Sequence, residues 1–184
     1  MKPDERLRQG LFLGFQYPRE IEGVRISTFL KAIYENKCKA VMGDKYKPTL
    51  MIHFTKTLEG LMNSLGIDTS YTHRYLNQGF SGGEKKKLEI LQMSMVDPRY
   101  VVMDEIDSGL DIDALRVIST ALNNFRSKDT GLLLITHYDR ILKQVKPDFV
   151  HIMVDGRIVR SGGYELAEQV EKEGYESFKL KVVS

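Results

Sequence analysis

One stretch of this sequence, residues 80–111, restricts the possible folds more than any other. It begins with FSGGEKKKLEILQM and ends with YVVMDEIDSGLD. The first part has the form of a glycine-rich helix start, and the second that of a short buried strand that ends in two adjacent carboxylates. Either half is common alone. In this order they predict a site that combines a helix N-terminus with paired acidic side chains.

The predicted helix opens with Ser81, Gly82, Gly83 and Glu84. These residues form a capping box, in which the Ser81 hydroxyl accepts from the Glu84 N–H and the Glu84 carboxylate reaches back. Capping does not explain two glycines in the first turn, each of which costs about 1 kcal/mol of helix propensity relative to alanine. Glycine there lets another group approach the free N–H groups, where the helix dipole favours an anion. We therefore interpret these four residues as a phosphate-binding helix start.

The paired carboxylates are Asp104 and Glu105, which follow the apolar run 100–103. In open α/β sheets, ligands bind at the carboxyl end of the strands. Two adjacent carboxylates at such a place are costly without a cation. We expect Asp104 to hold Mg²⁺ through water, because this ion keeps much of its hydration shell. We expect Glu105 to orient and deprotonate an attacking water.

Three other polar residues lie near the ends of predicted elements. Gln16 ends the apolar run 11–15, and His137 follows the run 132–135 at the same predicted sheet edge. A lone histidine is usually structural, but this position favours a contact to a terminal phosphate. Asp111 precedes a predicted helix and, taken alone, is explained equally well as an N-terminal cap.

The hydrophobic pattern predicts an α/β protein. Residues 20–80 are expected to be mostly helical, with helices over 28–40 and 50–65, and a further helix runs from Ser81 to about Met95. After Pro98, short apolar runs alternate with helical patterns. The expected strands are 100–103, 132–135 and 149–154, in addition to the earlier apolar run 11–15, and the expected helices are 114–125, 140–145 and 165–173. Apolar runs of this kind favour parallel strands buried on both faces. Asp155-Gly156 predicts a hairpin turn, so that 157–160 returns antiparallel at an edge.

Composition excludes several other classes of function. The chain has 27 basic and 25 acidic residues, which gives no support for binding nucleic acid or an anionic membrane surface. The single cysteine, Cys38, excludes an internal disulfide, fits a reducing compartment, and is too few thiolates for an iron-sulfur cluster. No apolar run approaches the roughly 18 residues of a membrane span. We expect a cytoplasmic protein that is not inserted in a membrane.

Five stretches carry a resemblance to ATP-binding-cassette (ABC) ATPases, and within them to the SufC family, the ATPase subunits of the Suf iron-sulfur cluster assembly machinery. They are GLFLGFQYPREIEGV at 10–24, GFSGGEKKKLEILQM at 79–93, MDEIDSGLDIDAL at 103–115, THYDRIL at 136–142 and PDFVHIMVDGRIVRSGGYELA at 147–167. The resemblance covers essentially the whole chain. ABC transporter ATPases usually continue the signature with a glutamine- and arginine-rich helix, whereas this chain has lysines followed by EILQ at 89–92.

The resemblance implies the fold of an ABC-type nucleotide-binding domain, a member of the P-loop NTPase fold. It implies a helical subdomain over about 20–95, which includes the signature helix, and an α/β core over 96–184. By the same resemblance, Gln16 is the Q-loop residue, which serves both the metal and catalysis, and residues 81–84 are the nucleotide-binding signature. Asp104 becomes the Walker B aspartate that holds Mg²⁺, and Glu105 the catalytic base.

The resemblance further makes Asp111 the D-loop aspartate, which contributes to nucleotide binding, and His137 the catalytic switch histidine. The implied cofactors are ATP and Mg²⁺. In such ATPases two subunits enclose two nucleotides, so that the signature of one completes the phosphate site of the other. The implied partners are therefore a second copy of the chain and scaffold proteins like SufB and SufD.

One element of the family is absent from the sequence. No G-x-x-x-x-G-K-[ST] phosphate loop occurs, and none of the 15 glycines precedes a lysine. Family members begin with a β-rich segment that carries this loop, so the resemblance implies an N-terminally truncated domain. We expect these 184 residues alone to bind ATP weakly, to be inactive or nearly so, and to self-associate through exposed apolar sheet surface.

Two alternatives remain open from the sequence. The chain could be the ATP-binding subunit of a membrane ABC transporter, or a catalytically inactive interaction module that keeps its scaffold-binding surface. A further hypothesis concerns the three lysines at 85–87 on the signature helix. If one of them, with Lys86 as the first candidate, pairs with Glu105, it holds the catalytic base in a resting state until dimerisation releases it.

Overall fold

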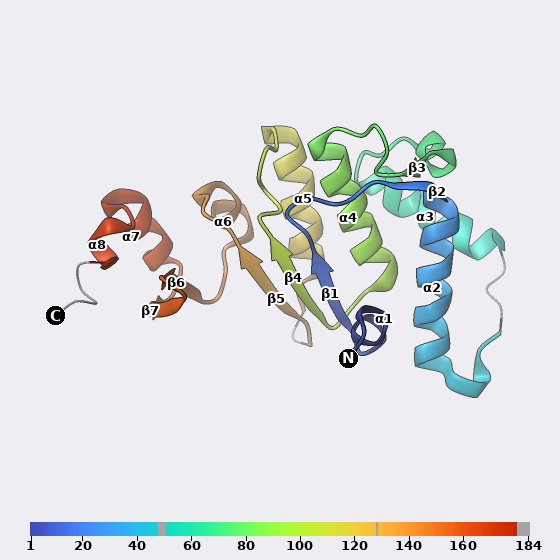
Figure 1. The fold of residues 1–184 in the computed structure, drawn as a ribbon, viewed down its shortest axis with the longest axis horizontal. Coiled ribbons are helices and arrows are strands. Elements are labelled where there is room, and N and C mark those ends of the chain that lie inside the picture. Colours follow the sequence, from blue (N-terminus) through green and yellow to red (C-terminus); the bar gives the residue numbers. More distant parts are fainter. Residues whose placement is uncertain (48–50, 128, 180–184) are drawn as a thin grey trace. The chain divides into compact units, whose positions relative to one another are not determined.

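The computed structural model describes residues 1–47, 51–127 and 129–179. It divides into two compact units, Met1–Thr136 and His137–Ser184. Figure 1 shows the order of the helices and strands along the chain. The first unit contains the parallel sheet and every predicted site residue except His137.

The centre of the first unit is a parallel sheet of three strands. These are β1 (Leu11–Gly14), β4 (Tyr100–Asp104) and β5 (Gly131–Ile135), in the order β1-β4-β5. Gly14 lies opposite Met103, and Asp104 lies opposite Ile135. The three strands therefore end at the same edge, as the apolar runs predicted. Residues that follow these strands are brought together although they are far apart in the sequence.

Two helices, α4 (Gly82–Val96) and α5 (Ile112–Phe125), cover one face of this sheet (Figure 1). Alternate residues of β1 and β4 point toward them and are buried, namely Phe12, Val101 and Met103. The α4 helix is buried on almost every side from Leu88 onward, which is typical of a helix enclosed by neighbours. A connection of three residues, 97–99, joins α4 to β4, so the N-terminus of α4 lies near the carboxyl edge of the sheet.

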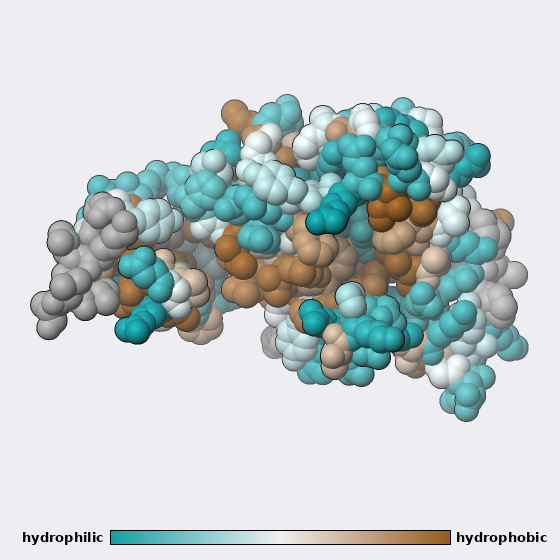
Figure 2. Space-filling model, in the orientation of Figure 1, coloured by the Kyte–Doolittle hydropathy of each residue, from teal (hydrophilic) through white to brown (hydrophobic). Residues whose placement is uncertain are grey.

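The opposite face of the sheet is exposed, which corrects the expectation that the strands are buried on both faces. Its side chains include Leu13, Leu133 and Ile135, each of which is about half exposed to solvent. Figure 2 shows hydrophobic residues gathered over these strands on the viewed face. Successive side chains of a strand point to opposite faces, and within the described residues of the first unit helices cover only one of them. The continuous apolar runs predicted these strands correctly. They did not predict how many faces of the sheet are covered.

The remaining helices of the first unit are α1 (Pro3–Arg8), α2 (Ile26–Met42) and α3 (Met51–Ser64), with short 3₁₀ turns at Gly43–Lys45 and Thr69–His73. The predicted helices over 28–40 and 50–65 are confirmed, apart from Leu50, which lies outside the described residues. An antiparallel pair, β2 (Ile21–Arg25) and β3 (Tyr75–Leu76), was not predicted. Tyr34 of α2 and Phe54 of α3 pack with ring centroids 6.1 Å apart.

The second unit contains α6 (Asp139–Val145), β6 (Val150–Val154), β7 (Arg157–Gly162), α7 (Glu165–Glu173) and α8 (Glu176–Lys179). The predicted hairpin at Asp155-Gly156 is confirmed: both residues have positive φ, 48° and 76°, and β7 returns antiparallel to β6. The expectation of a parallel strand over 149–154 is wrong, because the partner of β6 is β7. Ile152, Leu166 and Phe178 form a small core of their own. The subdomain boundary near residue 95 stays a prediction.

Among the described residues, no helix has both the length and the apolar character needed to cross a membrane.

Candidate active site

The structure brings together two predicted site residues, Gln16 and Glu105, at the carboxyl edge of the sheet. Gln16 lies two residues beyond β1, and Glu105 directly follows β4. The Gln16 side-chain amide Nε2 donates to Glu105 Oε2 across 2.5 Å. This bond leaves the Gln16 carbonyl oxygen Oε1 as the remaining polar atom of the amide, and an amide oxygen is an acceptable ligand for Mg²⁺.

The backbone of Glu105 is unusual. Its φ is +45°, in the left-handed region that side-chain-bearing residues rarely adopt. The Glu105 N–H donates to the Ile135 carbonyl across 2.8 Å, and its own carbonyl accepts from the Ser108 N–H. These bonds hold the strained conformation, which turns the chain sharply at the strand end. Strain of this kind costs about 1–3 kcal/mol and is concentrated at functional sites.

Asp104, the last residue of β4, is half-buried beside this contact. Its side chain makes no hydrogen bond or ion pair with another described residue, which leaves the carboxylate oxygens to a cation. The described part of the chain contains no group of three or more histidine, cysteine or acidic side chains arranged for a metal. Magnesium does not need one, because it keeps several waters and is commonly held by one or two carboxylates together with substrate phosphates. Asp104 and Gln16 therefore fit the predicted role.

The predicted capping box is present at the start of α4. The Glu84 N–H donates to Ser81 Oγ across 3.3 Å, and Glu84 Oε2 accepts from the Ser81 N–H and hydroxyl, each at 2.8 Å. Neither Gly82 nor Gly83 has a positive φ, so backbone conformation does not require glycine at either position. A Cβ added at Gly82 would meet nothing within 4 Å. The first turn is therefore open on this side, as a helix start that binds a phosphate requires.

A cluster of two aromatic rings and one guanidinium, from Tyr71, Phe80 and Arg74, supports this helix start. The Tyr71 and Phe80 rings meet edge to face at 4.9 Å, and the Arg74 guanidinium lies 3.7 Å from the Phe80 centroid. The Tyr71 hydroxyl donates to Glu84 Oε1 across 2.8 Å. The Ser81 N–H, then the Tyr71 hydroxyl, lower the pKa of Glu84 below its ordinary value. The sequence does not indicate this support, because residues 71–80 carry no helical or strand periodicity.

Asp111 is the N-terminal cap of α5, which is one of the two roles that the sequence allowed for this residue. Its Oδ1 accepts from the Ala114 N–H across 2.7 Å at the start of α5. A Cβ added at Gly83 would lie 3.8 Å from both Leu110 and Ala114, so the signature turn lies next to this loop. A contact of Asp111 to nucleotide stays a prediction.

His137 is the first residue of the second unit. Its imidazole packs against the Tyr138 ring with centroids 3.9 Å apart. This ring packing does not test the expected contact of His137 to a phosphate, which stays a prediction.

Sequence reasoning missed a buried carboxylate at Asp107, two residues after Glu105. Its side chain is fully buried and accepts from the Thr136 hydroxyl at 3.0 and 2.9 Å. The bond ties the loop after β4 to the residue that follows β5. The signal in the sequence was a third acidic residue soon after the pair Asp104 and Glu105.

The proposed pairing of Lys86 with Glu105 is not what the structure shows. Lys86 Nζ donates to the Phe15 carbonyl across 2.6 Å and lies 3.8 Å from Glu89 Oε2. Glu89 Oε1 accepts from the Phe15 N–H across 2.7 Å. Lys86 therefore has a partner on its own helix, one turn away, and both side chains face the residue that precedes Gln16.

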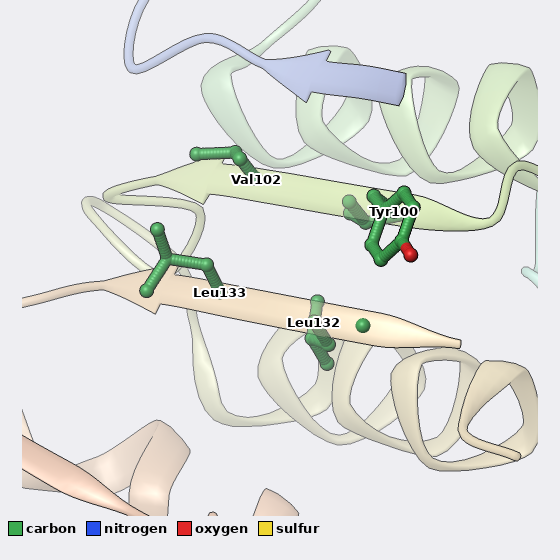
Figure 3. A pocket seen from close by; sticks show the side chains of 6 residues that line it. Tyr100, Val102, Leu132 and Leu133 are labelled. Atoms are coloured by element: carbon green, nitrogen blue, oxygen red, sulfur yellow. The ribbon is translucent and has the colours of Figure 1, made fainter. Parts of the chain in front are cut away.

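One hollow in the first unit lies away from these residues. Figure 3 shows it on the exposed sheet face, between Tyr100 and Val102 of β4 and Leu133 of β5, with Leu132 beside it. The Tyr100 ring lies over Gly131, where an added Cβ would come within 2.8 Å of it. The hollow is shallow and almost wholly apolar, with no converging polar groups, so it does not define the site.

No protein-family model matches the chain. The chain is 48% identical over 182 residues to vegetative protein 296 of Bacillus subtilis, covering 99% of this chain and 68% of that protein. It is 51% identical over 175 residues to a probable ABC transporter ATP-binding protein of Streptococcus pyogenes serotype M3, with coverage of 95% and 66%. It is also 43% identical over 176 residues to the probable ATP-dependent transporter ycf16 of Cyanophora paradoxa, with coverage of 96% and 67%.

Solved structures show the same fold. An ATP-binding subunit of an ABC transporter superposes with a TM-score of 0.71 at 19% identity, covering 99% of this chain and 71% of that one. The ADP conformation of MJ1267, an ABC transporter cassette, gives a TM-score of 0.67 at 21% identity, with coverage of 98% and 72%. The chain belongs to the ATP-binding cassette family of ATPases. It spans about two thirds of the length of the curated relatives that it matches.

Proposed function

We propose that this protein is the ATPase subunit of an iron-sulfur cluster assembly complex, where ATP hydrolysis drives conformational change in a scaffold. The observation that carries the proposal is the α4 helix. It starts with the SGGE signature and continues with KKKLEILQ rather than the glutamine- and arginine-rich sequence usual in transporter ATPases. In the structure, Lys86 and Glu89 of this segment are buried in contact with the Phe15 backbone, so the difference lies inside the site region.

The proposed chemistry follows from the contacts at the sheet edge. Glu105 accepts the proton of the water that attacks the terminal phosphate, and its bond to Gln16 keeps one carboxylate oxygen fixed. Asp104 and Gln16 would hold Mg²⁺, which when bound neutralises charge on the phosphates. Ser81, Gly82 and Gly83 offer an open helix start to a phosphate, and Asp111 and His137 complete the predicted set.

The open side of the α4 helix start supports a site shared between two subunits. The Gly82 turn has no neighbour within 4 Å of an added Cβ, so a second subunit can present nucleotide there. One solved structure with the same fold, MJ0796, is described as dimeric, at a TM-score of 0.68 and 15% identity. We propose that this chain also pairs when it binds ATP.

The test is purification of the protein expressed from its native gene, followed by identification of what accompanies it. We expect scaffold proteins like SufB and SufD in the soluble fraction, and ATPase activity that rises when the purified scaffold is added. The Glu105→Gln variant should bind the same scaffold without the stimulated activity, which assigns that activity to this subunit. Absence of both scaffold binding and stimulation contradicts the proposal.

A second candidate is the ATP-binding subunit of a membrane transporter. The names of relatives favour it, since the Streptococcus pyogenes protein is called a probable ABC transporter ATP-binding protein. Co-purification with polytopic membrane subunits from detergent extracts, and not with soluble scaffold, would select this function. The third candidate, an inactive interaction module, predicts scaffold binding without detectable ATP binding, which calorimetry with magnesium-ATP measures directly.

A further inference from the structure

We propose that Lys86 and Glu89 are positioning residues that hold the Gln16 segment in place for hydrolysis, an inference that rests on the proposed ATPase function. The two side chains bind both polar backbone atoms of one residue, Phe15. Glu89 Oε1 accepts from the Phe15 N–H across 2.7 Å, and Lys86 Nζ donates to the Phe15 carbonyl across 2.6 Å.

This contact controls the orientation of Gln16, because it holds the peptide group that precedes this residue. The Phe15 carbonyl belongs to the planar peptide group that also contains the Gln16 nitrogen and Cα. Lys86 therefore fixes the plane from which the Gln16 side chain extends toward Glu105. The Phe15 side chain is 58% exposed, so this residue is held by its backbone rather than by a packed ring. Gln16 then reaches Glu105 Oε2 at 2.5 Å.

The arrangement is costly for stability, which argues that it has another role. Lys86 and Glu89 are only 3% and 4% exposed, in a helix that is otherwise apolar at Leu88, Ile90 and Leu91. Their charged atoms are 3.8 Å apart, and Glu89 Oε2 has no hydrogen-bond partner. Buried ion pairs are often no more stabilising than apolar residues of similar volume. The polar pair gives what an apolar pair cannot, two directed bonds to the Phe15 backbone.

Close packing at the end of β1 makes the contact specific. A Cβ added at Gly14 would lie 3.6 Å from the Glu89 carboxyl carbon and 2.3 Å from the Met103 sulfur. Glycine at this position therefore lets the end of β1 lie directly against α4. The strand end, the Phe15 backbone and the two α4 side chains form one continuous contact that leads to Gln16.

The first experiment measures hydrogen-deuterium exchange of the full chain without nucleotide. We expect Glu89→Leu and Lys86→Met to increase exchange in peptides that contain Phe15 and Gln16, by about tenfold or more. Glu89→Gln should keep the protection, because its amide oxygen can still accept from the Phe15 N–H. Lys87→Met is the matched control, since Lys87 lies on the same helix but makes no hydrogen bond or ion pair with Phe15 or Glu89, and it should leave the exchange unchanged. Unaltered protection in Glu89→Leu and Lys86→Met overturns the positioning role.

The second experiment asks whether the pair acts through Gln16. In ATPase assays on the protein expressed from its native gene, Glu89→Leu is expected to lower kcat about 10- to 100-fold with KM for ATP nearly unchanged, as a small misplacement of a catalytic group does. Glu89→Gln should restore most of kcat. In a Gln16→Ala background, Glu89→Leu should have little further effect, because the residue it positions is gone.

The outcomes separate the two proposals. Independent, multiplicative losses in the double variant mean that Glu89 acts by another route, which overturns the inference but keeps the ATPase function. Absence of any ATPase activity in the wild type, including after addition of scaffold, contradicts the proposed function. The exchange measurement still decides in that case whether Lys86 and Glu89 hold the Gln16 segment.

Discussion

Gln16 and Glu105 are 89 residues apart in the sequence, yet the Gln16 amide donates to the Glu105 carboxylate across 2.5 Å. They meet because β1 and β4 are parallel neighbours in register, so their carboxyl ends lie at one edge. The contact unites the predicted Q-loop residue with the predicted catalytic base. Substitutions at these two residues test this relationship.

Replacement of Glu105 by glutamine is expected to lower the rate of ATP hydrolysis by about 100- to 10,000-fold, because glutamine keeps the shape but cannot accept the proton. ATP affinity should remain close to that of the wild type, measured by calorimetry. Asp104→Asn is the matched variant one residue earlier and should instead weaken magnesium-dependent binding. Turnover at the wild-type rate in Glu105→Gln would remove this residue from the mechanism.

Replacement of Gln16 by glutamate places a second carboxylate within hydrogen-bond distance of Glu105. Two carboxylates that share a site cannot both ionise easily, so one pKa of the pair rises. We expect the rising limb of the pH profile of kcat/KM to move to higher pH in this variant. Gln16→Ala should lower the rate without that upward movement, and an identical limb in both variants would contradict the contact.

Replacement of Tyr71 by phenylalanine removes the hydroxyl that donates to Glu84 Oε1 while keeping the ring packed against Phe80. Because this bond helps to lower the pKa of Glu84, that pKa should rise toward its ordinary value in the variant. An NMR titration of the Glu84 carboxyl carbon measures the change. Tyr75→Phe is the control, since Tyr75 is exposed and its hydroxyl makes no such bond. The prediction fails if both variants give the wild-type titration curve.

Glu89 predicts a specific dependence of stability on pH. Burial raises its pKa from 4.5 to about 7, although the Phe15 N–H and then Lys86 lower it. Burial likewise lowers the pKa of Lys86, so for both groups the loss of hydration outweighs their mutual attraction. Between pH 4.5 and about 7, Glu89 is protonated in the folded protein but ionised in the unfolded chain, so the folded protein binds more protons. The contribution of Glu89 to the free energy of unfolding is therefore present at low pH and is lost as pH rises through about 7.

In the Glu89→Gln variant the side chain at this position does not titrate. Comparison with the wild type therefore isolates the contribution of Glu89 to the free energy of unfolding. The difference in free energy of unfolding between wild type and variant should change by at most about 3 kcal/mol between pH 4.5 and pH 7. Urea denaturation at a series of pH values measures it. A difference that stays constant over the series would show that the folded-state pKa of Glu89 is ordinary.

The exposed sheet face predicts self-association of these 184 residues. Leu133 is 53% exposed on that face, beside Tyr100 and Val102. Leu133→Gln should reduce the aggregate fraction seen by light scattering, because it breaks a contiguous apolar surface. Val41→Gln, at a 76% exposed position of α2, is the control and should have a smaller effect. Equal effects of the two variants would show that the sheet face is not the associating surface.

The sequence by itself determined the local elements and the polar residues that end them. The Ser81–Glu84 capping box, the Asp111 cap and the hairpin at Asp155-Gly156 depend on residues at most a few positions apart. Local hydrogen bonds and φ preferences therefore sufficed to predict them. The apolar runs also predicted β1, β4 and β5 and the edge at which Gln16 and Glu105 meet, because parallel strands have a common direction.

Only the tertiary structure decided which partners the buried charges have and which surfaces remain exposed. Lys86 was expected at Glu105, but it binds Phe15 and lies near Glu89, because the end of β1 packs directly against α4 at Gly14. No local pattern indicates that one backbone carbonyl will replace a carboxylate as the partner of a lysine. The partner of β6 and the exposed face of the sheet were likewise decided by packing between distant segments, since an apolar run is the same whether one face or both are covered.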